Sequence, residues 1–73
     1  MKTTKKQLEV LVLRAQGLSN KQIAHKLGID VSAVRDRIKR VIAKCGASDL
    51  VHAIAILIAE GAIVIEDNHD RTD

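Results

Sequence analysis

Apolar positions recur at helical spacing along most of this chain and divide it into four segments. In the first segment leucine, valine and alanine repeat three and four residues apart, and the same period returns in the segments that follow. Glycines that can end a helix stand between the segments, and Ser, Thr or Asp stands where each helix would begin. The pattern predicts an all-α fold with helices over residues 5–16, 20–27, 31–45 and 49–60.

Two of these helices begin with a capping box, which is a reciprocal pair of hydrogen bonds at a helix N-terminus. Thr4 is followed three residues later by Gln7, and Ser19 is followed at the same distance by Gln22. Each hydroxyl can accept from the amide of the glutamine, whose side chain reaches back. The N-caps expected for the other two helices are Asp30 and either Ser48 or Asp49.

The segment 20–44 has the spacing of a helix-turn-helix. Ala24 is small where two helices must cross closely, Gly28 permits a positive φ in the turn, and Val34 is placed to close over the shorter helix. A helical hairpin that does not bind DNA is the alternative that this spacing leaves open.

The helix predicted over 31–45 has one apolar side and one cationic side. The apolar stripe consists of Val34, Ile38, Val41, Ile42 and Cys45. The opposite face carries Ser32, Asp36, Lys39, Arg40 and Ala43, and it is flanked by Arg35, Arg37 and Lys44. A helix with a buried seam and exposed cations fits a DNA groove, although an ordinary solvated surface helix can look the same.

The charge distribution favours a polyanionic partner. The formal net charge of the 73 residues is +3, but residues 1–45 hold eleven Lys or Arg against three Asp or Glu, a net of +8, and residues 46–73 hold one against six, a net of −5. Cations gathered around one predicted helix pair indicate nucleic-acid binding more strongly than the total does.

The helix predicted over 49–60 is apolar nearly all round. Ala53, Ile54, Leu57 and Ile58 can face a core, which leaves a second apolar face on the other side. We expect that face to form a two-fold homodimer, with interface residues Val51, His52, Ala55, Ile56 and Ala59. The alternative is a helix wedged between the core and residues 62–65, which could extend the helix or form a short apolar strand.

Other classes of protein are disfavoured by the sequence. The apolar run 50–65 is short and is interrupted by polar residues, so we expect no membrane span and a cytoplasmic location. Cys45 is the single cysteine, and we interpret it as a small buried hydrophobe in a reducing compartment. The three histidines have no metal-ligand spacing with it, so we expect no metal, no cofactor and no enzymatic activity.

Residues 17–24, Gly-Leu-Ser-Asn-Lys-Gln-Ile-Ala, carry a specific resemblance. The segment resembles the signature of the LuxR/FixJ/GerE family of bacterial transcription regulators, with Gln22 where the family has glutamate. The same register continues through Leu27-Gly28-Ile29, Val34-Arg35, Ile38 and Gly46-Ala47 to about residue 63. The family's opening pattern is altered, because its arginine and first glutamate are replaced here by Lys6 and Gln7. Two further departures are Ala33 for a common threonine and Leu50 for a frequent arginine.

The resemblance implies a four-helix domain in which the second and third helices form the helix-turn-helix and the fourth dimerises. Residues implied to meet base edges are Arg35, Asp36 and Lys39, although Asp36 could instead pair with Arg40 at i+4. Residues expected to contact phosphates are Asn20, Lys21, Ser32, Arg37, Arg40 and Lys44. The chain resembles the stand-alone, GerE-like form, with no receiver or ligand-binding domain.

These observations predict a sequence-specific DNA-binding regulator of bacterial, phage or plasmid type. It would bind double-stranded DNA as a dimer, with its third helix in the major groove. The DNA-binding domain would span residues 1–65, and residues 66–73 would form a polar, disordered tail. The alternative function is a protein-interaction module that acts on RNA polymerase or on a larger regulator through the fourth helix.

Overall fold

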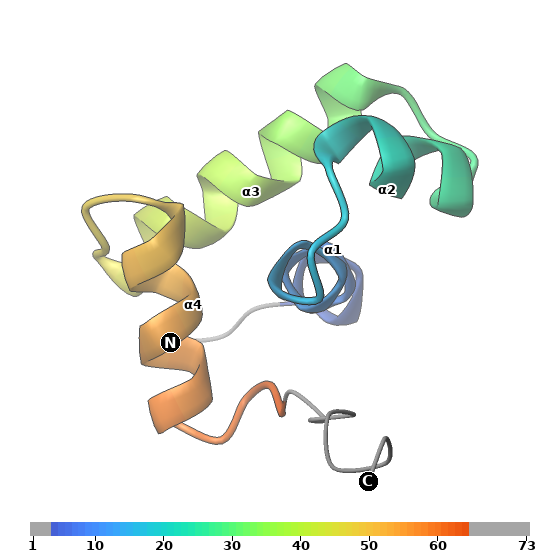
Figure 1. Ribbon diagram of the computed structural model, residues 1–73. Coiled ribbons are helices and arrows are strands. Elements are labelled where there is room, and N and C mark those ends of the chain that lie inside the picture. Colours follow the sequence, from blue (N-terminus) through green and yellow to red (C-terminus); the bar gives the residue numbers. More distant parts are fainter. Residues whose placement is uncertain (1–3, 65–73) are drawn as a thin grey trace, which may run out of the picture.

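The computed structural model describes residues 4–64, which form four α-helices and no β-strand. The helices are α1 (Lys5–Ala15), α2 (Asn20–Leu27), α3 (Val31–Cys45) and α4 (Leu50–Ala59). α1 lies beneath α2 and α3 in Figure 1, and α4 descends from the C-terminal end of α3, away from α2. The predicted all-α fold is confirmed, and each helix boundary agrees with the prediction to within one residue.

Both predicted capping boxes are present. Gln7 N donates to Thr4 Oγ1 at 3.2 Å, and Thr4 N donates to Gln7 Oε1 at 3.1 Å. At the start of α2 the same pair of bonds joins Ser19 and Gln22, at 3.1 and 2.8 Å. These bonds satisfy amide groups that an α-helix leaves without internal partners, so the sequence itself fixes where α1 and α2 begin.

The turn between α2 and α3 is closed by backbone geometry. Gly28 has a φ of +68°, in the left-handed region that glycine adopts most readily, and Ile29 N then donates to Ala24 O at 3.0 Å. Asp30 stands at the N-cap of α3 as predicted, but its carboxylate makes no capping hydrogen bond. At α4 the N-cap is Asp49, whose Oδ1 accepts from His52 N at 2.8 Å.

A core of aliphatic side chains joins the four helices. It is formed by Val10 and Leu11 of α1, Ile23 and Ala24 of α2, Val34, Ile38 and Val41 of α3, and Leu57 of α4. α3 contacts each of the other three helices. Because three positions of its apolar stripe are buried, the opposite face of α3 is held toward solvent.

Two expectations for the end of the domain are wrong. Residues 62–64 neither extend α4 nor form a strand, because Gly61, at a φ of +77°, turns the chain and Ala62 N donates back to Leu57 O at 2.8 Å. This turn buries Ile63 against the core, with 4% of its surface exposed. Ile58 does not face the core either, since 43% of its surface is exposed.

Two other expectations lie outside the described residues. They are the conformation of Ile65 and the disordered tail predicted for residues 66–73. Within residues 4–64, no single helix is long and apolar enough to cross a membrane, and only α3 and α4 taken together, bent by 59°, reach the required length and composition.

Candidate nucleic-acid interface

The exposed face of α3 carries the charges that the sequence pattern placed there. Ser32, Lys39 and Ala43 are exposed, as are Asp36 and Arg40 beside them. Arg40 Nε and Asp36 Oδ2 are 2.9 Å apart, so the i+4 ion pair weighed for Asp36 is present. Their side chains are 66% and 58% exposed, so the pair lies in solvent and contributes little to stability.

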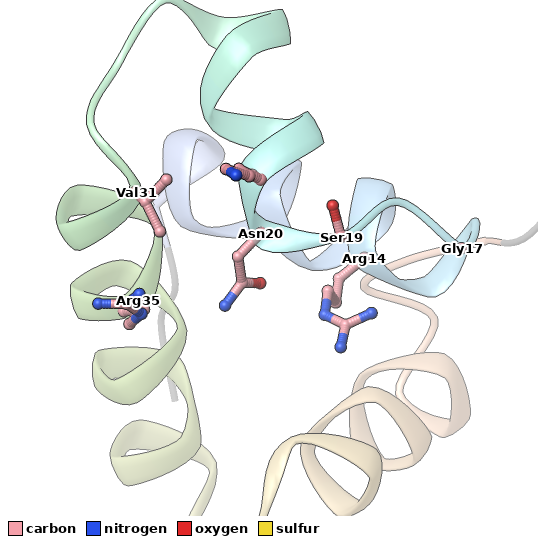
Figure 2. Close-up of a pocket in the computed structure, with 7 residues that line it drawn as sticks. Arg14, Gly17, Ser19, Asn20, Val31 and Arg35 are labelled. Atoms are coloured by element: carbon pink, nitrogen blue, oxygen red, sulfur yellow. The ribbon is translucent and has the colours of Figure 1, made fainter.

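A basic cleft borders α3 on the side of α2, and we call it the α2 cleft. It has a volume of about 510 Å³ and is lined by Arg14, Gly17, Ser19, Asn20, Lys21, Val31 and Arg35. Figure 2 shows that Asn20, at the start of α2, lies between Arg35 of α3 and Arg14 of α1. The α2 cleft therefore brings together two predicted phosphate-contacting residues and one predicted base-contacting residue, Arg35.

A second basic cleft lies between α3 and the N-terminal end of α1, and we call it the α1 cleft. Its volume is about 380 Å³, and its lining residues are Thr4, Lys6, Gln7, Ala33, Asp36, Arg37 and Arg40. Arg37 and Arg40 were both predicted to contact phosphate. At 100° per residue, Val31 and Arg35 of the α2 cleft lie on one side of the exposed face that carries Lys39, and Ala33 and Arg37 of the α1 cleft lie on the other. Asp36 and Arg40, which also line the α1 cleft, belong to the exposed face itself. The exposed face of α3 thus has one basic cleft on each side.

Lys44 lies on α3 near the N-terminus of α1. Its Nζ donates to Gln7 Oε1 at 3.1 Å, and this same oxygen accepts from Thr4 N. Gln7 is the buried polar side chain among the described residues, with 9% of its surface exposed. Because glutamine is neutral, this hydrogen bond positions the Lys44 ammonium group without neutralising it.

Two cations that line the clefts, Arg14 and Lys6, were not predicted to contact DNA. Both belong to α1, for which the sequence analysis predicted no DNA contact. Arg14 is the basic residue in the last turn of α1, where a positive charge interacts favourably with the negative end of the helix dipole. In the sequence, this interaction alone is enough to explain an arginine at that position. Only the tertiary arrangement brings α1 alongside both clefts.

α4 leaves an apolar face uncovered in the single chain. Val51 is 76% exposed, and Ala55 and Ala59 are exposed as well. Ile58 joins this face, whereas Ile56, which was predicted to belong to the interface, is half-buried at its edge. His52 borders the face, and its Nδ1 accepts from Ser48 N at 3.0 Å. We call the set Val51, Ala55, Ile58 and Ala59 the α4 face.

Cys45 lies in the last turn of α3 and is half-buried against the core. Burial of the side chain, and secondarily the negative charge of Glu60, raise the pKa of its thiol above the ordinary value of 9.0. A thiol with a raised pKa is a weak nucleophile at neutral pH, which agrees with the structural role expected for it. Among the described residues, no group of three His, Cys, Asp or Glu side chains could hold a metal ion.

Comparison with known proteins identifies the family. Residues 1–57 match the family of bacterial regulatory proteins described as the luxR family. Over 60 residues the chain is 40% identical to the "uncharacterized transcriptional regulatory protein YxjL" of Bacillus subtilis (strain 168). The aligned residues make up 82% of this chain and 28% of that protein. Over 50 residues it is 38% identical to the "transcriptional regulatory protein LiaR" of the same organism, covering 68% of this chain and 24% of that protein.

The chain thus spans about a quarter of the length of these two curated relatives. No solved structure gives a significant match. The family match covers most of the described helices, and four helices with α2 and α3 as the helix-turn-helix are the arrangement that the resemblance implied. The family consists of regulators rather than enzymes, which agrees with the non-enzymatic class predicted from the sequence. This chain belongs to the luxR family of bacterial regulatory proteins.

Proposed function

We propose that this chain is a sequence-specific DNA-binding transcription regulator that acts in the bacterial cytoplasm and reads the major groove with α3. The observation that carries the proposal is the exposed cationic face of α3 with a basic cleft on each side. A helix lying in the major groove has a phosphate strand on either side of it, so cations are needed in both places. The two relatives named as transcriptional regulators support the same role.

Base recognition in this proposal depends on Arg35 and Lys39. Both side chains are exposed on the solvent-facing side of α3, and both can donate hydrogen bonds to the O6 and N7 acceptors of guanine. Asp36 was the third residue predicted to meet a base. Because its carboxylate already pairs with Arg40, we assign it to orienting that guanidinium before we assign it to cytosine or adenine.

Phosphate contacts are divided between the two sides of α3. On the α2 side we propose Asn20 and Lys21, and on the α1 side Arg37 and Arg40. Ser32 and Lys44 complete the predicted set, Ser32 from the first turn of α3 and Lys44 from its last turn. Lys44 can serve in this way because its bond to neutral Gln7 does not cancel its charge.

The first test is binding of a random-sequence duplex, measured by fluorescence anisotropy at several salt concentrations. The native chain should bind with an affinity that falls steeply as salt rises, because each neutralised phosphate contributes about 0.9 to the slope of log affinity against log salt. The double variant Arg35→Ala/Lys39→Ala should bind more weakly. The control is Lys26→Ala, which removes one charge from the exposed surface of α2 outside both clefts and is compared with each of the single variants Arg35→Ala and Lys39→Ala.

Selection from a pool of random duplexes then tests sequence recognition. The native chain should enrich one sequence, and Arg35→Ala or Lys39→Ala should lose about 1–3 kcal/mol of discrimination at single positions in it. If the folded native chain fails to bind any duplex at low salt, the proposal is wrong.

We further propose that the regulator is a homodimer joined through the α4 face. Four apolar or small side chains are exposed there on one short helix, and the small Ala55 and Ala59 permit close approach of a second copy. Residues 52 and 56 lie at the margin of this face. A two-fold dimer presents two copies of α3, so its site would consist of two half-sites in inverted arrangement.

Sedimentation equilibrium of native chain and of Val51→Glu, with and without DNA, tests the dimer. The charge should abolish association without unfolding the monomer, because Val51 makes little contact with its own core. Lys26→Glu is the control for an added carboxylate elsewhere. A native chain that stays monomeric with DNA would favour the second candidate for the α4 face, which is docking onto RNA polymerase or another regulator.

A further inference from the structure

The α2 cleft contains a guanidinium that the helix-turn-helix itself does not supply. Arg14 lies in the last turn of α1, outside α2 and α3, and its side chain is half-buried. Figure 2 shows its guanidinium in the α2 cleft, near Ser19 and Asn20 at the start of α2 and facing the same space as Arg35. We propose that Arg14 is a phosphate-binding residue that holds a phosphodiester of the bound duplex in the α2 cleft, which rests on the DNA-binding function proposed above.

The guanidinium is held in a fixed position before any ligand arrives. Arg14 Nη1 donates to Leu18 O at 3.2 Å, and Leu18 N donates to Leu13 O at 3.2 Å, so the side chain is tied to a turn that is itself closed. Because a guanidinium is planar, fixing one nitrogen limits the directions of its other N–H groups. Little side-chain freedom is then left to lose when a phosphate binds.

The charge of Arg14 is not neutralised within the described part of the chain. The side chains that line the α2 cleft include three cations, Arg14, Lys21 and Arg35, and no carboxylate. Arg14 Nε is buried, and it has no hydrogen-bond partner among the described residues. Like charges gathered in one cleft repel each other unless an anion joins them, and an arginine fork matches the oxygens of a phosphodiester.

Asn20 contributes both a hydrogen-bond donor and an acceptor to the lining of the α2 cleft. Its Oδ1 is buried and also lacks a partner among the described residues, and an acceptor of this kind does not bind an anion. In Figure 2 the Asn20 amide nitrogen points toward the side of Arg35 and its oxygen toward the side of Arg14. The amide nitrogen is therefore available to a phosphate beside Arg35, and a phosphate held by Arg14 would have to lie clear of the oxygen. The hydroxyl oxygen of Ser19 already accepts from Gln22 N, so its proton remains available as a donor.

A purely structural role for Arg14 predicts something different. If the side chain served only to hold Leu18 O, its replacement would affect the stability of the α1–α2 turn and leave the electrostatics of DNA binding unchanged. The two roles can be separated by the salt dependence of binding, which counts neutralised phosphates and does not respond to stability in a chain that remains folded.

The experiment compares the native chain, Arg14→Gln, Arg14→Lys and Lys26→Gln on one random-sequence duplex over a range of salt, with folding checked by circular dichroism. Arg14→Gln should lower the slope of log affinity against log salt by about 0.9, by the same amount on duplexes of different sequence. Arg14→Lys, which keeps the charge, should retain the native slope. Lys26→Gln should also retain it, because Lys26 lies outside both clefts.

A folded Arg14→Gln chain with the native slope would overturn the role proposed for Arg14 while leaving the DNA-binding function standing. A native chain that binds no duplex would overturn both. If Arg14→Gln fails to fold, an NMR titration of the native chain tests the contact instead. The Arg14 Nε–H resonance in a ¹⁵N spectrum should shift when duplex is added. An Nε–H signal unchanged at saturating duplex would reject the contact.

Discussion

Lys44 and Gln7, which are 37 residues apart in the chain, are joined by a 3.1 Å hydrogen bond from Nζ to Oε1. The bond ties the last turn of α3 to the first turn of α1. The same Gln7 oxygen also accepts from Thr4 N, so one neutral carboxamide completes the cap of α1 and positions a cation on the proposed DNA-binding helix. A carboxylate at this position would neutralise the cation.

Gln7→Glu should therefore stabilise the fold. A glutamate keeps both acceptor roles, adds an ion pair with Lys44, and places a negative charge at the positive end of the α1 dipole. Lys44 is exposed, so the gain should be only about 0.5 kcal/mol, which corresponds to roughly 2–4 °C in Tm. Thermal unfolding followed by circular dichroism measures it.

Gln16→Glu is the control for the Gln7 prediction. It introduces the same charge at the C-cap of α1, where the helix dipole is unfavourable. A Tm increase of the same size in Gln16→Glu would show that added negative charge, rather than the geometry around Lys44, is responsible.

Asp36→Asn should strengthen nonspecific DNA binding. The change removes a negative charge from the exposed face of α3 and releases Arg40, which is 66% exposed, to meet a phosphate. Affinity for a random duplex should rise and the salt slope should become steeper by up to about one unit, while stability changes by less than about 0.5 kcal/mol. Anisotropy titrations measure the first two quantities.

A different result would assign Asp36 another role. If Asp36→Asn weakens binding to one selected sequence and leaves random duplexes unaffected, the carboxylate accepts from a base and the ion pair with Arg40 is secondary.

The start of each of the first two helices was predictable because the information is local. Thr4 and Ser19 each find their glutamine three residues away, and the apolar stripe of α3 gives its orientation. α4 had no such signal: a helix that is apolar on nearly every side does not reveal which face is buried. For that reason Ile58 was placed in the core although it is exposed.

The candidate site was predictable only where it belongs to the helix-turn-helix. The cationic face of α3 follows from helical periodicity, since its apolar and charged positions separate at 100° per residue. The positions of Arg14 and Lys6 beside the two clefts, and the bond between Lys44 and Gln7, depend on how α1 crosses the other helices. No spacing within a single segment contains that information.

The stability of the fold should fall in alkaline solution through Cys45. Because its thiol pKa is raised in the folded chain, the unfolded chain releases its proton first as the pH rises. The contribution of the protonated thiol to the free energy of unfolding is fully present below the ordinary pKa of 9.0, and it is lost as the pH rises through the folded-state pKa. Urea unfolding at several pH values should show this loss in the native chain, and Cys45→Ala should show a smaller one.

The comparison with Cys45→Ala isolates the thiol, because every other side chain is the same in the two proteins and the chain contains no tyrosine. An identical pH dependence in the two chains would mean that the thiol pKa is the same in the folded and unfolded states.

Ile63 should anchor the chain that follows α4. Its side chain is 4% exposed and packs in the core cluster, whereas its neighbour Val64 is 74% exposed. Ile63→Ala removes three buried carbons and leaves a cavity, so the free energy of unfolding should fall by about 2–4 kcal/mol. In a chain of this size such a loss is a large part of the total stability, and urea unfolding should show a much lower midpoint.

Val64→Ala is the matched control, because it shortens an aliphatic side chain at the next position with little change in buried surface. Its free energy of unfolding should stay within about 0.5 kcal/mol of the native value. If the two variants lose similar stability, Ile63 does not hold the segment in the core, and the turn at Gly61 must be set by the backbone bonds to Leu57 O alone.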